Sequence, residues 1–386
     1  MKEKQKIKLG IYLCSLLMMG AIAVASNLAN IIAAFPDVAP TTIVAYLISL
    51  PCLIVIPVTL ITGKLMNQFS KKSLIIAGIL FWLIGGVAPY FLNNLTAIAI
   101  MRAIFGVGIG MIQTLCAALV VENFEDQAER NKTMGNVAAF QMLGTIIFSL
   151  VAGNLGAIGW HVAFLVHLIA VISLIGAIIL LPNNIPTKQE SSVAKIKFVA
   201  TKFMWIWTLG LMIFMIGGQT YVNSASAIIE EFKLDDSIAA GYSLDIFALG
   251  GLLMGLFFGK VSQKFGKNTL LIGGGLMMLG VFVIALVPNL IVSYIGAFLC
   301  GASFSIIIPS ALNGTAGSVD SESSEMAVSI ATCAQNIGMA ISPYVMTSLG
   351  ALIVSWGLSI NQATLLFAVD ISGLGMLILY FVNKRK

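Results

Sequence analysis

Apolar stretches alternate with short polar breaks along the whole chain. An α-helix rises 1.5 Å per residue, so about 20 apolar residues cross the hydrocarbon layer of a bilayer, which is roughly 30 Å thick. The chain is therefore expected to be an all-α integral membrane protein. The pattern predicts twelve membrane-spanning helices, at approximately residues 10–34, 40–62, 73–92, 95–121, 134–154, 160–181, 203–227, 238–259, 269–287, 289–313, 326–353 and 361–382.

The composition excludes a soluble protein. Of 386 residues, 59% are hydrophobic and 10% are charged, with a mean hydropathy of +1.01. An ordinary soluble domain carries about 25% charged residues, so this chain lacks the charge to cover a globular surface in water. No nucleotide-binding loop, hydrolase motif or cluster of metal ligands occurs in the sequence. We therefore expect no enzyme activity, no cofactor, no metal and no transport driven by ATP hydrolysis within the chain.

The basic residues predict how the chain lies in the membrane. When the breaks are assigned alternately to two sides, all but two of the 21 Lys+Arg residues fall on one side. The exceptions are Lys233, on the other side, and Arg102, inside a span. Because basic loops stay in the cytoplasm, both termini are expected to be cytoplasmic. The net charge of +5 is thus a topology signal and requires no nucleic-acid partner. We expect a multi-pass protein of the cell membrane.

The sequence contains an internal repeat. Three segments recur in the same order, at an offset of roughly 195 residues. They are Gly63–Leu74 with Gly259–Leu270, Ser26–Phe35 with Asn223–Phe232, and Gln141–Gly144 with Gln335–Gly338. The repeat predicts two six-helix halves, 1–181 and 203–386, joined by a cytoplasmic linker at 182–202. Transporters built from parallel repeats bind their substrate between the halves and expose it alternately to each side. A channel or a passive scaffold is the alternative for such a chain.

The loop at 63–72 resembles the signature of the major facilitator superfamily between spans two and three. The matching residues are Gly63, Leu65, Lys71 and Lys72, with Gly259, Gly266 and Lys267 in the second copy. Arg102, followed by Gly106, Gly108 and Gly110, resembles the arginine–glycine motif of the family on span four. The pattern is most similar to the short bacterial drug and metabolite exporters. This resemblance implies a monomer with twelve helices in two pseudo-symmetric halves, and a small-molecule substrate with protons as the coupling ion.

Two departures from the family pattern bear on the mechanism. Asn67 stands where the family has an aspartate in the loop after span two, and Gln263 is its counterpart in the second half. A latch built on that acid is therefore absent or weakened. The antiporter motif on span five keeps its glycine spacing, which includes Gly144, but Ser149 stands where proline is expected and the repeat counterpart is Pro343. The signature is partial, so it leaves the direction of transport open.

Three charged residues lie well inside spans: Arg102, Asp245 and Asp370. A charge at the centre of a membrane helix costs about 2.5–3.5 kcal/mol on insertion scales, so it requires a partner or a wet cavity. Arg102 is a candidate for proton coupling or for binding an anionic substrate, and hydrogen bonding to backbone carbonyls is the structural alternative. Asp245 could carry the proton, anchor a cation or pair with Arg102. Asp370 corresponds to His167 in the repeat and is the weakest candidate.

The resemblance implies that spans one, four, seven and ten face the substrate cavity. Amide and hydroxyl side chains on these spans either contact substrate or hydrogen-bond neighbouring helices. The cavity candidates are Asn27, Asn30, Gln113, Gln219, Tyr221, Asn223 and Ser310, with Gln141 and Gln335 nearby. The residues expected to support the conformational change are Gly63, Lys71, Lys72, Gly144, Gly259, Gly266 and Pro343.

The sequence therefore predicts a secondary transporter that works by alternating access. The favoured activity is proton-coupled efflux of a small, largely apolar or amphiphilic compound. An uptake permease in which Arg102 holds an organic anion is the first alternative. A lipid flippase on the same fold and a membrane receptor without transport are the others.

Overall fold

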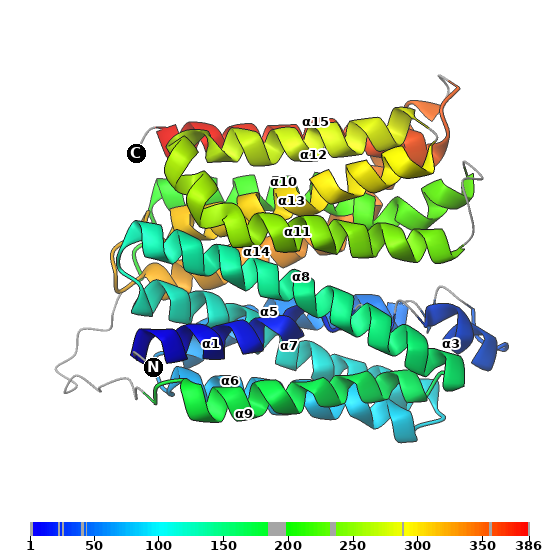
Figure 1. Ribbon diagram of the computed structural model, residues 1–386, viewed down its shortest axis with the longest axis horizontal. Coiled ribbons are helices and arrows are strands. Elements are labelled where there is room, and N and C mark those ends of the chain that lie inside the picture. The colour runs from blue at the N-terminus through cyan, green and yellow to red at the C-terminus, as the bar shows by residue number, and fades with distance from the viewer. Residues whose placement is uncertain are drawn as a thin grey trace. The chain divides into compact units, whose positions relative to one another are not determined.

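The computed structural model describes residues 3–21, 24, 27–39, 42–43, 45–183, 198–231, 237–287, 289–354 and 357–384 (Figure 1). These residues form helices and the turns that join them. Residues 184–197, which belong to the expected linker, lie outside the described residues. The chain divides into two compact units. Unit 1 comprises Met1–Asn123, Phe140–Val199 and Val328–Cys333, and unit 2 comprises Phe124–Ala139, Ala200–Ala327 and Ala334–Lys386.

Unit 1 is built around α7, which packs against α5 and α6, while α9 packs against α1 and α6. Several of its helices continue into short 3-10 or π-helical segments. The elements in this part of the chain are α1 (Glu3–Ser15), η1 (Leu16–Met19), α3 (Leu28–Ala34), η2 (Ala45–Ser49), α5 (Leu50–Leu65), α6 (Lys71–Val87), η3 (Ala88–Phe91), α7 (Leu95–Asn123), α8 (Gln127–Ile158), η4 (Val162–Ile169) and α9 (Ala170–Leu180).

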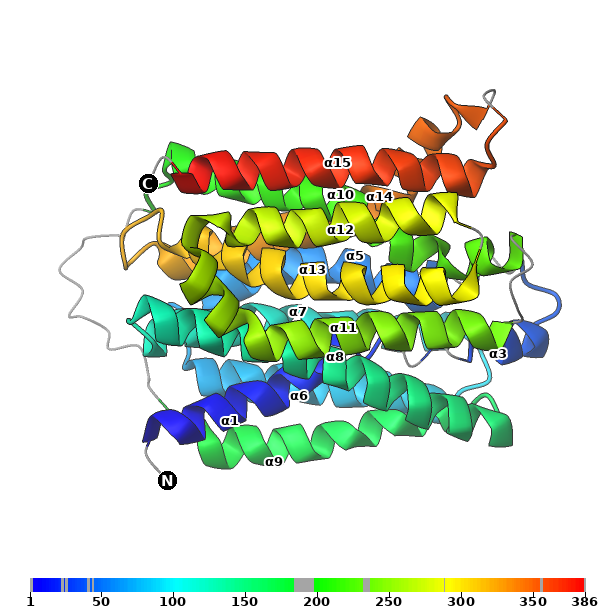
Figure 2. The ribbon, with the colours of Figure 1, turned by 45° about the horizontal axis from the view of Figure 1, so that its top comes forward.

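Unit 2 has longer and more regular helices. In it α10 packs against α15, α13 packs against α11 and α12, and α12 and α15 run side by side (Figure 2). The elements are α10 (Lys202–Glu231), α11 (Ser237–Phe265), η5 (Gly266–Asn268), α12 (Thr269–Leu286), α13 (Leu290–Ala316), α14 (Ser324–Gly350) and α15 (Ile360–Lys384). Two helices are shared between the units: Phe124–Ala139 places the start of α8 in unit 2, and Val328–Cys333 places part of α14 in unit 1.

The helices satisfy the main requirement of a lipid environment, which is that backbone N–H and C=O groups find partners within the protein. Nine segments of the described residues are long and apolar enough to cross a membrane. One of them, Tyr242–Leu286, contains most of α11 and all of α12. Between these two helices Gly266 has a φ of +51°, a left-handed conformation that favours glycine. The predicted motif residue Gly266 therefore shapes the turn that joins them.

The first expected span, 10–34, is not one continuous helix. Residues 3–15 are α-helical, 16–19 form the 3-10 segment η1, and the helix α3 begins at Leu28. In η1 the Leu17 carbonyl accepts a hydrogen bond from Trp82 Nε1 of α6 at 3.0 Å. A hydropathy pattern cannot show such a break, since the residues on both sides of it are equally apolar.

Glycines on α8 differ sharply in their surroundings. A Cβ atom added to Gly144 would overlap the carbonyl oxygen of Leu16 in η1, whereas a Cβ atom added to Gly153 would have no heavy atom within 4 Å. Gly144 is therefore the point at which α8 and the broken first span approach closely. This contact gives a structural reason for one of the predicted motif glycines.

We expect Gly144→Ala to destabilise the protein by about 1–3 kcal/mol, because the added methyl group overpacks the contact with Leu16. Gly153→Ala, the matched control on the same helix, should stabilise it by about 0.5–1 kcal/mol through helix propensity. Melting temperatures in detergent measure both effects. Equal melting temperatures for the two variants would contradict this account of the packing.

Candidate substrate and coupling site

Arg102 lies inside the helix packing of unit 1. It is fully buried on α7, seven residues and about 10 Å beyond Leu95 at the start of that helix. The glycines that follow let the neighbouring helices approach closely. A Cβ atom at Gly106 would lie 2.6 Å from the Pro51 carbonyl of α5, and one at Gly108 would lie 2.5 Å from the backbone nitrogen of Trp82 in α6. The arginine–glycine motif thus places the guanidinium in a tightly packed bundle.

The Arg102 guanidinium is only partly satisfied. Its Nε donates a 3.0 Å hydrogen bond to the carbonyl of Leu47 in the π-helical segment η2, and its Cζ lies 4.1 Å from the centre of the Phe105 ring. Nη1 and Nη2 are buried and have no hydrogen-bond partner within the described residues. A buried donor without a partner is costly, so these two groups are available to an anion, to water or to a moving side chain.

His167 belongs to the same cluster. It is fully buried on η4, and its Nδ1 lies 2.8 Å from the Phe164 carbonyl. Its ring centre lies 5.0 Å from that of Trp82 and 5.1 Å from that of Phe105, the ring that also contacts Arg102. The ring also lies within reach of the Gly20 backbone. The internal repeat pairs His167 with Asp370, so the sequence gives no sign that His167 lies close to Arg102.

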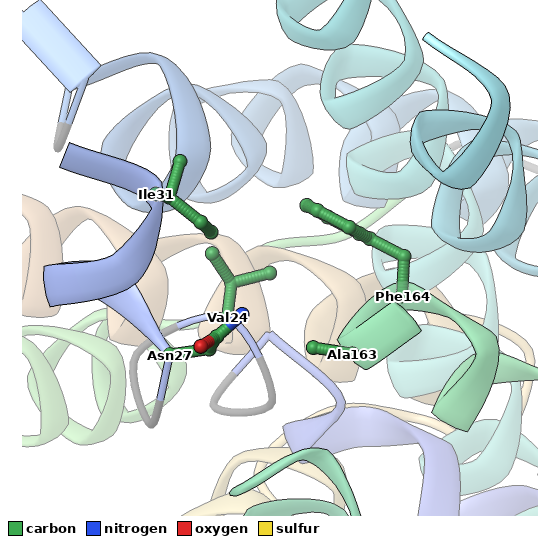
Figure 3. A pocket seen from close by; sticks show the side chains of 5 residues that line it. All are labelled: Val24, Asn27, Ile31, Ala163 and Phe164. Carbon is green, nitrogen blue, oxygen red and sulfur yellow. The ribbon is translucent and has the colours of Figure 1, made fainter. Parts of the chain in front are cut away.

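A small apolar pocket lies in the same unit. Val24, Asn27 and Ile31 from the first span face Ala163 and Phe164 of η4 across it (Figure 3). The pocket has no room for a water molecule in this structure. Asn27 is its polar member, and the Asn27 Nδ2 group donates to the carbonyl of Trp160 at 3.1 Å. The pocket is therefore closed in this structure.

The remaining candidates of unit 1 occupy different places. Asn30 is exposed and donates to Asn27 Oδ1 at 2.7 Å, while Gln113 and Gln141 are half-buried. Lys71 forms a 3.2 Å ion pair with Glu122 between the start of α6 and the end of α7. Of the other two motif residues in this region, Gly63 lies within α5 and is buried, and Lys72 lies within α6 and is half-buried.

In unit 2, an aromatic cluster surrounds Tyr221. This side chain is fully buried on α10, and its hydroxyl is hydrogen-bonded to Ser243 Oγ on α11. The Phe247 ring lies 6.0 Å from the Tyr221 ring and 5.3 Å from the Phe304 ring. Asp245 lies two residues beyond Ser243 and is half-buried. Because residues two apart on a helix do not share a face, Asp245 lies off the face of α11 that carries Ser243 and Phe247.

The other unit 2 candidates are less uniform. Ser310 donates to the Ile306 carbonyl of its own helix at 2.7 Å. Gln335 is buried, and its Oε1 has no partner among the described residues. Gln219 is half-buried and Asn223 is exposed. Asp370 is exposed on α15, on the side of the helix that also carries the exposed Leu374, Leu377 and Phe381. Gly259 lies on α11, and Pro343 lies within α14.

A family model described as Major Facilitator Superfamily matches residues 10–343. The chain belongs to this superfamily. A probable sugar efflux transporter of Haemophilus influenzae is 21% identical over 256 residues, which cover 65% of this chain and 63% of that protein. The multidrug efflux pump SdrM of Staphylococcus aureus is 31% identical over 162 residues, 41% of this chain and 35% of the pump. The chain thus spans less than two thirds of the length of these curated relatives.

Solved structures of the superfamily have the same fold. The human organic anion transporter MFSD10 superposes with a TM-score of 0.75 at 12% identity, over 98% of this chain and 100% of that one. The proton:xylose symporter XylE gives a TM-score of 0.74 at 14% identity, over 97% and 95%. These likenesses confirm the predicted twelve-helix fold of the superfamily.

We expect Arg102→Met to leave the melting temperature unchanged or to raise it. Replacing a buried charge that lacks an ionic partner with an apolar side chain of similar length is often neutral, or stabilising by about 1–4 kcal/mol. Thermal unfolding of the purified variant in detergent measures the effect. A large fall in melting temperature would assign Arg102 a structural role instead of a functional one.

Proposed function

We propose that this superfamily member is a proton-coupled exporter of a small, largely apolar or amphiphilic organic compound. The observation that carries the proposal is the buried Arg102, whose two Nη groups remain unpartnered within the described residues. Such a cation is expensive inside a membrane and is retained where it does work. In this proposal Asp245 takes up and releases the proton, while Arg102 favours the ionised state of the coupling site.

The side chains near the candidate residues support an apolar substrate. Arg102 and His167 share an aromatic cluster with Trp82 and Phe105, and Tyr221 lies against Phe247 in unit 2. Aromatic faces bind apolar and amphiphilic molecules without requiring an exact hydrogen-bond pattern. The names of the relatives, sugar efflux and multidrug efflux, agree with export and leave two substrate classes to test.

The membrane orientation is part of the proposal. The lysine-rich breaks lie on the side that carries both termini, which we assign to the cytoplasm of a bacterial cell. The protein is proposed to act as a monomer made of two six-helix halves, 1–181 and 203–386. Substrate would then bind from the cytoplasmic side and leave on the other side as protons enter.

A second candidate function rests on the same buried cation. If the Nη groups of Arg102 bind a carboxylate directly, the protein is an uptake permease for a small organic anion. A guanidinium binds a carboxylate through two parallel hydrogen bonds, and Arg102 has two such donors unpartnered within the described residues. One solved structure of this fold is named as an organic anion transporter.

Asp245→Asn should abolish accumulation driven by a pH gradient while equilibrium binding is kept, because the amide cannot exchange a proton. Accumulation is measured in everted membrane vesicles as uptake of rhodamine 6G or a radiolabelled hexose added outside. Binding is measured by thermal shift. Asp370→Asn is the matched variant at an exposed acid. An unchanged gradient response in Asp245→Asn would contradict the proposal, and a loss in Asp370→Asn alone would move the proton site to α15.

Arg102→Ala separates the two candidate functions. If Arg102 holds a substrate carboxylate, the variant should lose binding of organic anions and retain binding of their neutral amide analogues. If Arg102 tunes a proton site, binding should persist for both classes and the pH dependence of transport should shift. Paired thermal-shift titrations with benzoate and benzamide measure the difference.

A further inference from the structure

A polar cluster that the sequence pattern did not single out joins three helices of unit 2. Asn131, in the second turn of α8, donates from Nδ2 to Ser262 Oγ of α11 at 2.7 Å. Asn131 Oδ1 accepts a hydrogen bond from Asn313 Nδ2 of α13, also at 2.7 Å. A third bond, from Gln127 Nε2 to the same oxygen at 2.9 Å, holds the Asn131 amide in this orientation. We call Asn131, Ser262 and Asn313 the amide latch.

The latch lies beside an unusually close approach of α8 and α11. A Cβ atom at Gly135 would lie 2.6 Å from the Gly255 carbonyl, and one at Gly255 would lie 2.7 Å from the Ala139 backbone nitrogen. One turn further, a Cβ atom at Gly259 would lie 2.9 Å from Lys132 Cβ. Small residues four apart on both helices bring membrane helices together in this way. The close approach of α8 and α11 therefore depends on the glycines at these positions.

Helix α8 belongs to both units. Its first part, which carries Asn131, lies in unit 2, and the part that begins at Phe140 lies in unit 1. A transporter that moves one part against another must either bend this helix or release one of its ends. Glycine contacts and a few hydrogen bonds can be released without exposing a charge to lipid.

We propose that Asn131 is a positioning residue, which holds the first part of α8 to α11 and α13 through the amide latch and releases it during transport. All three members are uncharged, and the family aspartate positions are Asn67 and Gln263 here. The chain would thus replace a charge-based latch with amides and a hydroxyl. This inference rests on transport by alternating access and is independent of the coupling ion.

One polar atom of the amide latch lacks a hydrogen-bond partner among the described residues. Asn313 is 5% exposed, and its Oδ1 has no hydrogen-bond partner in the described part of the chain. A buried acceptor without a partner offsets part of what the Asn131–Asn313 bond contributes. The latch therefore holds the helices together without making their separation prohibitively costly, as a contact that opens in every cycle requires.

The test measures access to the buried side of α8 next to the latch. Met134, one turn beyond Asn131, is 2% exposed, and Met134→Cys introduces a reporter thiol on the full-length protein in lipid nanodiscs. Alkylation by N-ethylmaleimide is followed at that residue by mass spectrometry. Loss of the two latch bonds in Asn131→Ala should raise the rate about tenfold, the factor that corresponds to roughly 1.4 kcal/mol of lost hydrogen bonding.

Asn154→Ala is the matched control, because Asn154 is an exposed asparagine of α8 that donates to Leu150 of its own helix. It should leave the alkylation rate and the melting temperature unchanged. Adding Ser262→Ala to Asn131→Ala should cause no further increase if both residues act through one bridge. Raising the salt to 1 M KCl should not change the rate, since no member is charged.

Equal rates in Asn131→Ala and Asn154→Ala would overturn the proposal, as would strong acceleration by salt in the unmodified latch. If Met134→Cys perturbs packing, hydrogen–deuterium exchange of α8 peptides in the same variants decides between the same outcomes. None of these measurements requires a transported substrate. Failure of the latch is therefore distinguishable from failure of the proposed efflux activity.

Discussion

The constraint on which unit 1 depends is the presence of a guanidinium inside a membrane protein. Water is not available there, so each N–H group of Arg102 must find a partner or remain costly. The π-helical segment η2 supplies the Leu47 carbonyl, and the Phe105 ring accepts the positive charge on its face. Both Nη groups remain unpartnered within the described residues. The contacts of Nε and of the ring offset part of the cost of burying Arg102, and the two Nη groups are left to bind an anion.

Irregular helices accompany this site. The 3-10 segments η1 and η4 and the π-helical η2 all lie in unit 1, and residues from their spans pack in one cluster: Val24, Ile31, Ile43, Leu47, Ile98 and Phe164. Departures from α-helical geometry expose backbone carbonyls and are frequent at functional sites. Unit 2 has longer helices, and its buried hydroxyl groups bond both to a side chain, as Tyr221 does to Ser243, and to carbonyls of neighbouring helices, as Ser303 does to Gly273. The two units therefore differ in the regularity of their helices.

Much of this was predictable from sequence, because hydropathy and charge act over whole segments. The spans, the family and the twelve-helix fold follow from the length of apolar runs and from motifs such as Gly63–Lys72. Side-chain neighbours were not predictable, since they depend on which faces of distant helices meet. The proximity of His167 to Arg102 arises through Phe105, and the repeat comparison paired His167 with Asp370 instead. Asn131 carries no signal in the sequence, because one amide near a basic break is typical of an ordinary helix end.

The candidate site can be predicted only in part from the sequence, because its contacts depend on how the helices pack. Arg102 stands out by charge, and its burial and its hydrogen bond to η2 emerge only when the helices pack. Asp370 stands out equally by charge, yet it lies on an exposed face of α15. Charge inside a span therefore marks candidates, and the direction in which each side chain faces separates them. The assignment of the coupling proton to Asp245 remains a proposal that function must test.

The most direct test of that account is the sign of proton movement caused by substrate. Proteoliposomes containing the purified protein and trapped pyranine report internal pH when a compound selected by thermal shift is added outside. Proton-coupled export predicts that entry of the compound raises the internal pH, because protons leave in exchange, and that Asp245→Asn abolishes this signal. Acidification of the interior, or compound entry without any change in pH, would contradict the proposed mechanism.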